Sequence, residues 1–208
     1  MYISISGVHG IGKSTLCRLL ARRNGWQYSP EVLDTMIPPP RLGPKSPERL
    51  LGELWHMRQL ILREEEIKKY NNSVLITDRW WHDLIIYGKS LLSEKEFRIF
   101  EDIITAVPKE TPDLEIVLWA TPEALVERIK NRRRTTMTKW GEDDEEYLNK
   151  VNEEFKKYYE NFKEMRTIVL LEATGCVEDI YDSARKIIRT HIADTKQRSL
   201  KEFNCSKD

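Results

Sequence analysis

The residues with the clearest chemical signature lie near the start of the sequence, in the segment Gly7–Ser14. It reads Gly-Val-His-Gly-Ile-Gly-Lys-Ser and fits the pattern of a glycine, four residues, a second glycine, a lysine and a serine or threonine. Such a loop curls so that successive backbone N–H groups point at phosphate oxygens, and the helix that follows adds partial positive charge. Lys13 then reaches the β- and γ-phosphates of a nucleotide, Ser14 offers its hydroxyl to Mg²⁺, and Thr15 completes the cradle. The segment therefore predicts a nucleotide phosphate site.

A carboxylate follows a second apolar segment. Val74–Thr77 is apolar or β-branched, and Asp78 and Arg79 come directly after it. A carboxylate at the C-terminal edge of a parallel sheet is the second group that commonly organises Mg²⁺ beside a phosphate loop. By itself an Asp-Arg pair at a strand end is more often a structural ion pair, but the phosphate loop favours a catalytic role. We therefore predict Ser14 and Asp78 as metal ligands and Arg79 as a catalytic residue.

Short apolar runs alternate with helical periodicity and predict the elements that must position these residues. Five runs have strand length: Tyr2–Ser6, Trp26–Tyr28, Val74–Thr77, Glu115–Trp119 and Thr167–Leu171. Helices are predicted at Lys13–Arg23, Pro47–Tyr70, Glu94–Ile104, Pro122–Lys130, Asp143–Met165 and Val177–Ile192. This alternation favours a parallel sheet covered on both faces. The proline-rich segment Ile37–Pro47 is expected to form an extended excursion near the ligand edge.

Composition narrows the class of protein. The 208 residues include 34 Lys plus Arg and 34 Asp plus Glu, so the net charge is zero and no strongly basic surface is available for a nucleic-acid backbone. The three widely spaced cysteines, Cys17, Cys176 and Cys205, argue against a disulfide framework or a zinc site. No basic leader and no 18-residue apolar run occurs, so neither export nor a membrane span is predicted. We expect a cytoplasmic protein with one domain over residues 1–192 and a polar tail over 193–208.

Taken in order, these segments resemble the thymidylate kinase and deoxynucleoside kinase family of P-loop kinases. The resemblance rests on the loop 7–15, on Asp78-Arg79-Trp80 with the later Tyr87-Gly88, on the basic segment 128–134, and on Glu172-Ala173-Thr174 after the last strand. It runs from residue 2 to about residue 190. Many P-loop proteins share the loop, whereas the ordered combination is more specific than any of its parts.

The resemblance implies a fold and a donor. The fold is α/β, a P-loop NTPase with a five-stranded parallel sheet in the order 2-3-1-4-5, helices on both faces and a lid at about residues 128–142. ATP is the implied donor, with Mg²⁺ as its cofactor. We expect the donor to contact the loop, the start of the lid and the segment after the last strand: Gly7, His9, Gly10, Ile11, Gly12, Lys13, Ser14, Thr15, Arg128, Ala173, Thr174 and Cys176.

A cluster of cations lies where the family carries its lid. Arg132, Arg133 and Arg134 follow the helix after the fourth predicted strand. Phosphoryl transfer needs cations over the equatorial oxygens as charge shifts toward the leaving group. The phosphate loop contains no arginine, so we predict that the cluster is catalytic, without choosing among its three arginines.

The acceptor side is implied by the resemblance as well. It implies that Arg79 binds the acceptor and that Arg58 on the long helix contacts its base. Trp55 lies three positions before Arg58 and hence on the same helical face, so it either stacks on the base or packs in the core. Tyr87 is also expected at the acceptor. His9 stands where thymidylate kinases commonly carry an acidic residue.

The edge after the second predicted strand separates two acceptor chemistries. A thymidylate kinase of this family normally carries an arginine there for the acceptor phosphate, whereas this chain has Val32. Nucleoside kinases instead place a carboxylate at that edge to take the proton of the acceptor hydroxyl, and Glu31 fits this role. Arg41, Lys45 and Arg49 on the nearby excursion are alternative cations for an acceptor phosphate.

We interpret the sequence as an ATP- and Mg²⁺-dependent phosphotransferase. The favoured acceptor is a nucleoside monophosphate, most of all a thymidylate-like one (dTMP to dTDP). A deoxynucleoside kinase with a hydroxyl acceptor is the first alternative, and a nucleotide-dependent switch that hydrolyses its nucleotide is the alternative from another class. We expect no nucleic-acid or membrane partner, and a homodimer stays open.

Overall fold

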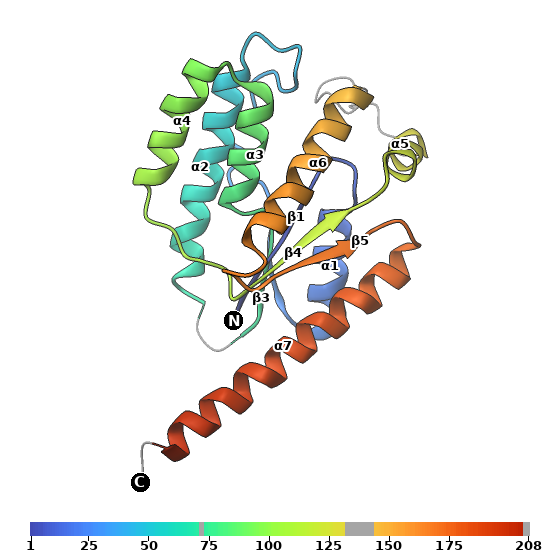
Figure 1. Ribbon diagram of the computed structural model, residues 1–208. Helices are drawn as coiled ribbons and strands as arrows, with labels where there is room; N and C mark the ends of the chain where they lie inside the picture. Colours follow the sequence, from blue (N-terminus) through green and yellow to red (C-terminus); the bar gives the residue numbers. More distant parts are fainter. Residues whose placement is uncertain (71–72, 132–143, 206–208) are drawn as a thin grey trace.

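The computed structural model describes residues 1–70, 73–131 and 144–205 (Figure 1). The elements are, in chain order, β1 Tyr2–Gly7, α1 Lys13–Asn24, β2 Gln27–Ser29, α2 Arg49–Ile67, β3 Leu75–Asp78, α3 Trp81–Leu91, α4 Glu94–Ala106, β4 Leu114–Trp119, α5 Pro122–Asn131, α6 Glu145–Phe162, β5 Ile168–Glu172 and α7 Val177–Cys205. Arg132, Arg133, Arg134 and most of the expected lid lie outside the described residues.

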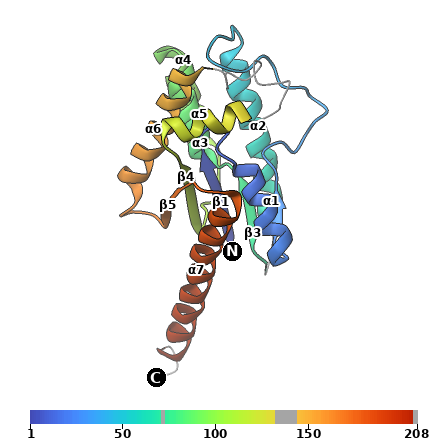
Figure 2. The ribbon, with the colours of Figure 1, turned by 90° about the vertical axis from the view of Figure 1, so that its right-hand side faces the viewer.

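The strands form one parallel sheet in the order β2-β3-β1-β4-β5, which confirms the predicted fold. The central strand β1 is buried at all six positions, as a strand covered on both faces must be. Helices α1 and α7 cover one face, and α2, α3 and α6 cover the other (Figures 1 and 2). Ile5 of β1 pairs with Asp78 of β3. The loop after β1 and the carboxylate of Asp78 therefore leave the sheet at the same edge.

Two helices differ from the prediction. Helix α3 was not predicted, because it opens without a hydroxyl cap and carries few polar residues. The Asp83 carboxylate instead accepts a hydrogen bond from the backbone amide of Trp80 at 3.0 Å, which caps the helix from inside. Helix α7 was expected to end at Ile192, yet it continues to Cys205 because neither glycine nor proline interrupts it. The segment expected as a polar tail thus begins inside a helix.

An apolar cluster fixes α2, α3 and α4 relative to one another. Met57 and Leu60 of α2 pack with Trp81 of α3 and with Phe100 and Ile104 of α4. All five side chains are buried, so shifts between α2 and α3 would open voids. These two helices form walls of the site described next. In the described part of the chain, no helix is both long and apolar enough to span a membrane.

Candidate active site

The loop between β1 and α1 needs its glycines. Gly7, Gly10 and Gly12 all have positive φ, at 140°, 78° and 110°. A Cβ at Gly7 would lie 2.7 Å from the carbonyl oxygen of Leu118, and one at Gly10 would lie 2.7 Å from Ile129 Cγ1. The close approach of β4 and α5 therefore excludes a larger residue, and the backbone can turn its amides inward.

Lys13 lies across this loop. Its ammonium donates hydrogen bonds to the carbonyl oxygens of Gly7 at 2.9 Å and Val8 at 3.0 Å, and the side chain is buried. Burial and the nearby Arg79 lower the pKa of Lys13 to about 8, against the opposing effect of Asp78. The ammonium is thus held at the loop in a position to meet the phosphates of a nucleotide.

Asp78 fits the predicted metal site. Both of its carboxylate oxygens are buried, and neither has a hydrogen-bond partner among the described residues. Burial and the charge of Glu31 raise the pKa of Asp78, while Lys13 and the Ser14 hydroxyl lower it. An unpartnered buried carboxylate beside a hydroxyl is a set of hard oxygen donors, which suits Mg²⁺. A bound cation would also stabilise the charged form of Asp78.

A pocket lies beside the loop and is lined by residues of the loop itself, of α5 and of the segment after β5. Arg128 joins its two walls, donating to the carbonyl oxygens of Ile11 at 2.9 Å and Gly175 at 2.7 Å. Its lining includes six residues predicted for ATP: Gly10, Ile11, Gly12, Thr15, Arg128 and Cys176. Ala173 and Thr174 do not line it. The Ala173 amide donates to Trp119 at 2.7 Å, and the Thr174 hydroxyl donates to Glu172 at 2.9 Å.

Arg79, directly after β3, lies at the centre of a cluster of charged side chains. Its backbone is left-handed, with φ of 73°, which is uncommon outside glycine. Nε lies 2.6 Å from the Glu31 carboxylate, Nη1 lies 3.5 Å from Asp83, and Nη2 lies 3.1 Å from His9 Nδ1. The guanidinium also sits 4.6 Å from the ring centre of Tyr87. The phosphate loop, the segment after β2 and helix α3 thus meet at one side chain.

Arg63 holds this arrangement from behind, a role that the sequence analysis missed. Its Nη1 donates to the carbonyl oxygens of Asp78 at 2.9 Å and Arg79 at 2.8 Å, and its Nη2 donates to Pro30. The side chain is 1% exposed. One buried guanidinium therefore fixes both the end of β3 and the segment that carries Glu31.

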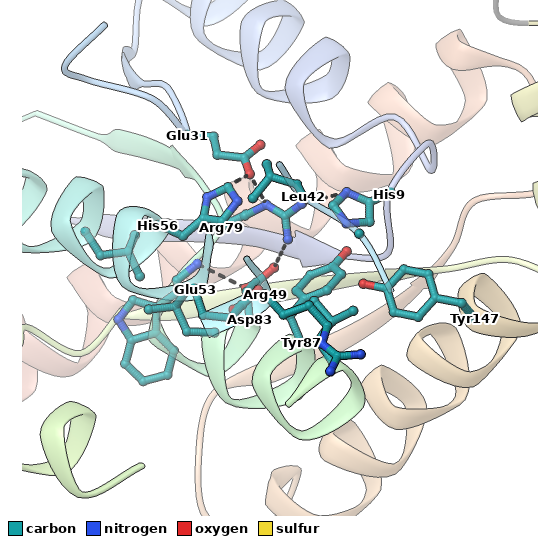
Figure 3. Close-up of a pocket in the computed structure, with 15 residues that line it drawn as sticks. His9, Glu31, Leu42, Arg49, Glu53, His56, Arg79, Asp83, Tyr87 and Tyr147 are labelled. Carbon is teal, nitrogen blue, oxygen red and sulfur yellow. Dashed lines mark hydrogen bonds and ion pairs between the residues drawn. The ribbon is translucent and has the colours of Figure 1, made fainter. Parts of the chain in front are cut away.

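Arg79 and its partners line a second pocket, between α2, α3 and the loop (Figure 3). Four residues predicted at the site reach it: His9, Glu31, Arg79 and Tyr87. Trp55 and Arg58 do not line it. The Trp55 indole donates to the Ile37 carbonyl at 3.0 Å, and Arg58 pairs with Asp34 at 2.5 Å. His9, which we had expected to contact ATP, thus lines the pocket beside Arg79 instead.

Known proteins resemble this chain over nearly its whole length. A family model described as deoxynucleoside kinase matches residues 3–195. The chain belongs to the deoxynucleoside kinase family. It is therefore a phosphotransferase, and the alternative of a nucleotide-dependent switch falls away.

Individual relatives of this kinase carry two kinds of name. A thymidylate kinase of Fervidobacterium nodosum is 25% identical over 206 residues, covering 92% of this chain and 100% of the relative. One of Caldicellulosiruptor saccharolyticus is 34% identical over 120 residues, or 55% of this chain and 53% of the relative. Among solved structures, a deoxyadenosine kinase of M. mycoides with dCMP and dCDP bound has a TM-score of 0.77 at 18% identity, covering 91% of this chain and 100% of that one.

The pocket beside Arg79 carries three groups with strongly shifted pKa values. Burial is the largest effect on Glu31 and raises its pKa, but Arg79 and the other basic groups nearby together outweigh it and hold the pKa at about 2. Burial lowers the pKa of His56 to about 4, so its imidazole is neutral at neutral pH, 3.8 Å from Glu31. Burial also raises the pKa of Glu53 to about 8, against the effect of Arg79. One ionised and one neutral carboxyl therefore face the same pocket.

Several lining residues of the kinase were missed in the sequence. Glu53, His56 and Leu60 are the missed residues on α2; together with Arg49, which had been predicted as an alternative cation, they recur at intervals of four, three and four and line the pocket. That spacing places them on one helical face, a signal that was available because the helix had been predicted. Asp83 could not be placed, because α3 itself was not recognised.

Proposed function

We propose that the kinase transfers the γ-phosphoryl group of ATP to the 5′-hydroxyl of a deoxynucleoside. The observation that carries this proposal is the ion pair of Glu31 with Arg79 in the acceptor pocket. A hydroxyl acceptor needs a carboxylate to receive its proton, whereas a phosphate acceptor needs cations that are free to hold it. The family model for deoxynucleoside kinases supports the same choice.

The charges around Arg79 argue against a phosphate acceptor. Its guanidinium is engaged by Glu31, by Asp83 and by the ring of Tyr87. The dianionic phosphate of a monophosphate acceptor would be repelled by ionised Glu31. Arg79 is the cation that would have to offset the charge of both groups. An uncharged sugar meets no such repulsion. Neutral Glu53 and neutral His56 add polar groups without charge, which suits a nucleoside.

The donor side supplies the remaining parts of the transfer. The loop amides and Lys13 would hold the donor phosphates, with the nucleotide base in the pocket crossed by Arg128. Ser14 and Asp78 would hold Mg²⁺, which neutralises charge on the phosphates when it is bound. Both pockets are lined by residues of one loop, His9 in one and Gly10, Ile11 and Gly12 in the other, so donor and acceptor would meet at this loop.

The proton in this reaction goes to Glu31. A bond forms between the acceptor hydroxyl oxygen and the γ-phosphorus, and the bond to the bridging oxygen breaks, leaving its electron pair on ADP. Glu31 accepts the hydroxyl proton. A carboxylate with a pKa of about 2 is a weak base, which is sufficient because the hydroxyl becomes strongly acidic only as the new bond forms. Its ionised state persists across the whole pH range of an assay.

A nucleoside monophosphate acceptor is the second candidate function. Arg49 lines the acceptor pocket and is one of the three cations predicted for a phosphate, while Arg41 and Lys45 do not line it. The two relatives named thymidylate kinase favour the same acceptor, with thymidylate as the first compound to test. For such an acceptor, Glu31 would act only as a ribose or positioning ligand.

The test compares Glu31→Gln with wild type on the four deoxynucleosides and their monophosphates, using ATP and Mg²⁺ and separating products by chromatography. Glutamine keeps the shape of Glu31 and removes its basicity. With the best deoxynucleoside, we expect kcat to fall by about 10²- to 10⁴-fold and ATP KM to stay unchanged. Glu101→Gln, an exposed carboxylate on α4, is the matched control and should leave kcat unchanged.

Two outcomes would reject the hydroxyl acceptor. The first is a wild-type kcat/KM that is higher for a monophosphate than for every deoxynucleoside. The second is a Glu31→Gln variant that keeps kcat within about tenfold on its best acceptor, since a base contributes more than that. Either result would transfer the proposal to the monophosphate candidate.

A further inference from the structure

A second polar cluster lies behind Arg79 and shares Asp83 with the pocket. It consists of Ser6 on β1, Asp83 on α3, Glu115 on β4, Tyr158 on α6 and Arg166 after α6. Ser6 Oγ lies 2.7 Å from Asp83 Oδ2 and 3.2 Å from Glu115 Oε1. The Tyr158 hydroxyl lies 2.7 Å from Glu115 Oε2, and Arg166 Nη1 lies 2.8 Å from that hydroxyl. The cluster thus links the inside of the sheet to Asp83.

Counting protons shows that Ser6 can form hydrogen bonds to both carboxyl groups only if one of them is neutral. Ser6 has one hydroxyl proton and contacts two carboxyl groups, so it can donate to only one of them. Ionised carboxylates accept hydrogen bonds and cannot donate them. The second contact is a hydrogen bond only if Asp83 or Glu115 carries a proton and donates it to the serine oxygen.

The partners of each carboxyl decide where the proton lies. Burial raises the pKa of Asp83, but Asp83 accepts the backbone amide of Trp80 at 3.0 Å and lies 3.5 Å from the Arg79 guanidinium, and both contacts oppose that rise by favouring its charged form. The contacts of Glu115 favour its charged form less strongly. Tyr158 donates its hydroxyl proton to Glu115, because Arg166 already donates to the Tyr158 oxygen. The proton therefore belongs on Glu115.

The surroundings of Glu115 agree with this assignment. The Glu115 side chain is 2% exposed, and the Arg166 guanidinium stays 3.9 Å away. Burial raises the pKa of Glu115 to about 7, aided by Asp83 and opposed by Tyr158, Arg166 and Ser6. Behind Arg166 stands His82, whose pKa burial lowers to about 3, so it adds no second cation at neutral pH.

We propose that Glu115 is a protonated positioning residue, which donates to Ser6 so that Ser6 donates to Asp83 and holds it against Arg79. In this chain Asp83 has one oxygen fixed by Ser6 and Trp80, leaving the other toward the guanidinium (Figure 3). Loss of the Glu115 proton would place two anions on one hydroxyl, and Asp83 would no longer be held in place. The inference rests on Arg79 in the acceptor pocket and holds for either acceptor chemistry.

Glu115→Gln tests the proton directly. The side-chain amide reproduces neutral Glu115, because its NH₂ can donate to Ser6 while its oxygen accepts from Tyr158. At pH 6 we expect kcat/KM for the acceptor to stay within about threefold of wild type. Because wild type loses the proton as pH rises and the variant cannot, the ratio of variant to wild-type kcat/KM should rise roughly tenfold by pH 8.5. A ratio compares the two proteins at each pH, so titrating groups common to both cancel.

Two further variants separate positioning from simple packing. Ser6→Ala breaks the link and leaves Glu115 in place, so acceptor kcat/KM should fall roughly tenfold or more while ATP KM is unchanged.

Glu53→Gln removes the other neutral carboxyl of the region and serves as the control for an infrared titration. Infrared absorption of a protonated carboxyl that titrates near pH 7 should be present in wild type and Glu53→Gln and absent in Glu115→Gln.

The proposal is overturned by a large loss of kcat/KM in Glu115→Gln at pH 6, because an ionised carboxylate would then be required. A ratio that stays constant or falls with pH overturns it as well. So does an unchanged infrared titration in Glu115→Gln, which needs only the folded protein and no activity. If Ser6→Ala does not fold, the ratio and the infrared titration still decide.

Discussion

Glu53 should cost the folded kinase stability at alkaline pH. Its side chain is 4% exposed, and one carboxyl oxygen is buried without a hydrogen-bond partner among the described residues. Burial raises its pKa from 4.5 to about 8. Below pH 4.5 both the folded and the unfolded chain hold the proton of Glu53, so this residue adds no pH dependence to the free energy of unfolding. Between pH 4.5 and 8 only the folded chain holds it, so the free energy of unfolding falls as pH rises.

The magnitude follows from the same numbers. One pKa unit corresponds to 1.36 kcal/mol, so the rise from 4.5 to about 8 corresponds to roughly 4–5 kcal/mol at pH 8 and above. Glu53→Gln cannot ionise, so the variant escapes this loss. For a chain of this length, about 1 kcal/mol shifts Tm by roughly 2–4 °C, so we expect a gain of about 10 °C over wild type at pH 8. At pH 4.5 the gain should vanish.

The assay is thermal unfolding of wild type, Glu53→Gln and the exposed-site control Glu101→Gln at pH 4.5, 6 and 8 in one ionic strength. The decisive quantity is how the difference in Tm between variant and wild type changes with pH. A difference that is the same at pH 4.5 and pH 8 would refute the reasoning, because an isosteric change that acts only through packing has no reason to depend on pH. Glu101→Gln should show no pH-dependent difference.

Two predictions concern the donor side. Lys13→Ala should abolish most turnover while leaving the thermal melt near wild type, because Lys13 supplies a point charge to the donor phosphates and its ammonium bonds only to loop carbonyls; turnover near wild type would reject the phosphate-loop assignment. Joint replacement of Arg132, Arg133 and Arg134 by alanine should lower kcat far more than it raises ATP KM, since lid cations act on charge that develops in the transition state. A change in ATP KM alone would identify the cluster as a ground-state binding surface.

The sheet was predictable because each strand is a short apolar run between polar or turn residues. The strand Tyr2–Ser6 was found to within one residue, and the loop that follows fixed its direction. The strand order, however, came from the family resemblance and not from periodicity. Helix α3 was missed because local signals for a helix are capping hydroxyls and an alternating polar face, and the segment after Trp80 lacks both.

Candidate site residues could be proposed from the sequence where a motif or a position after a strand distinguishes a single side chain. Lys13 is identified by the phosphate-loop motif, and Asp78 and Glu31 are identified by their positions at the ends of predicted strands. Arg63 and Glu115 cannot be identified in this way, because their roles depend on contacts made across at least fifteen and more than a hundred residues of sequence, respectively. Such contacts exist only after the sheet has formed. Nothing in a linear pattern distinguishes an arginine that supports the site from one on a solvated helix face.

The conformation of Arg79 shows why these supporting residues matter. A non-glycine residue with φ of 73° costs on the order of 1–3 kcal/mol and persists only when its surroundings hold it. Arg63 binds the carbonyl oxygens on either side of that turn, and Asp83 and Glu31 hold the guanidinium that it presents. Because Arg63 also binds Pro30, the same side chain sets where Glu31 meets Arg79. The acceptor pocket is therefore built as one unit, in which the strained turn, its clamp and its ion pairs must form together.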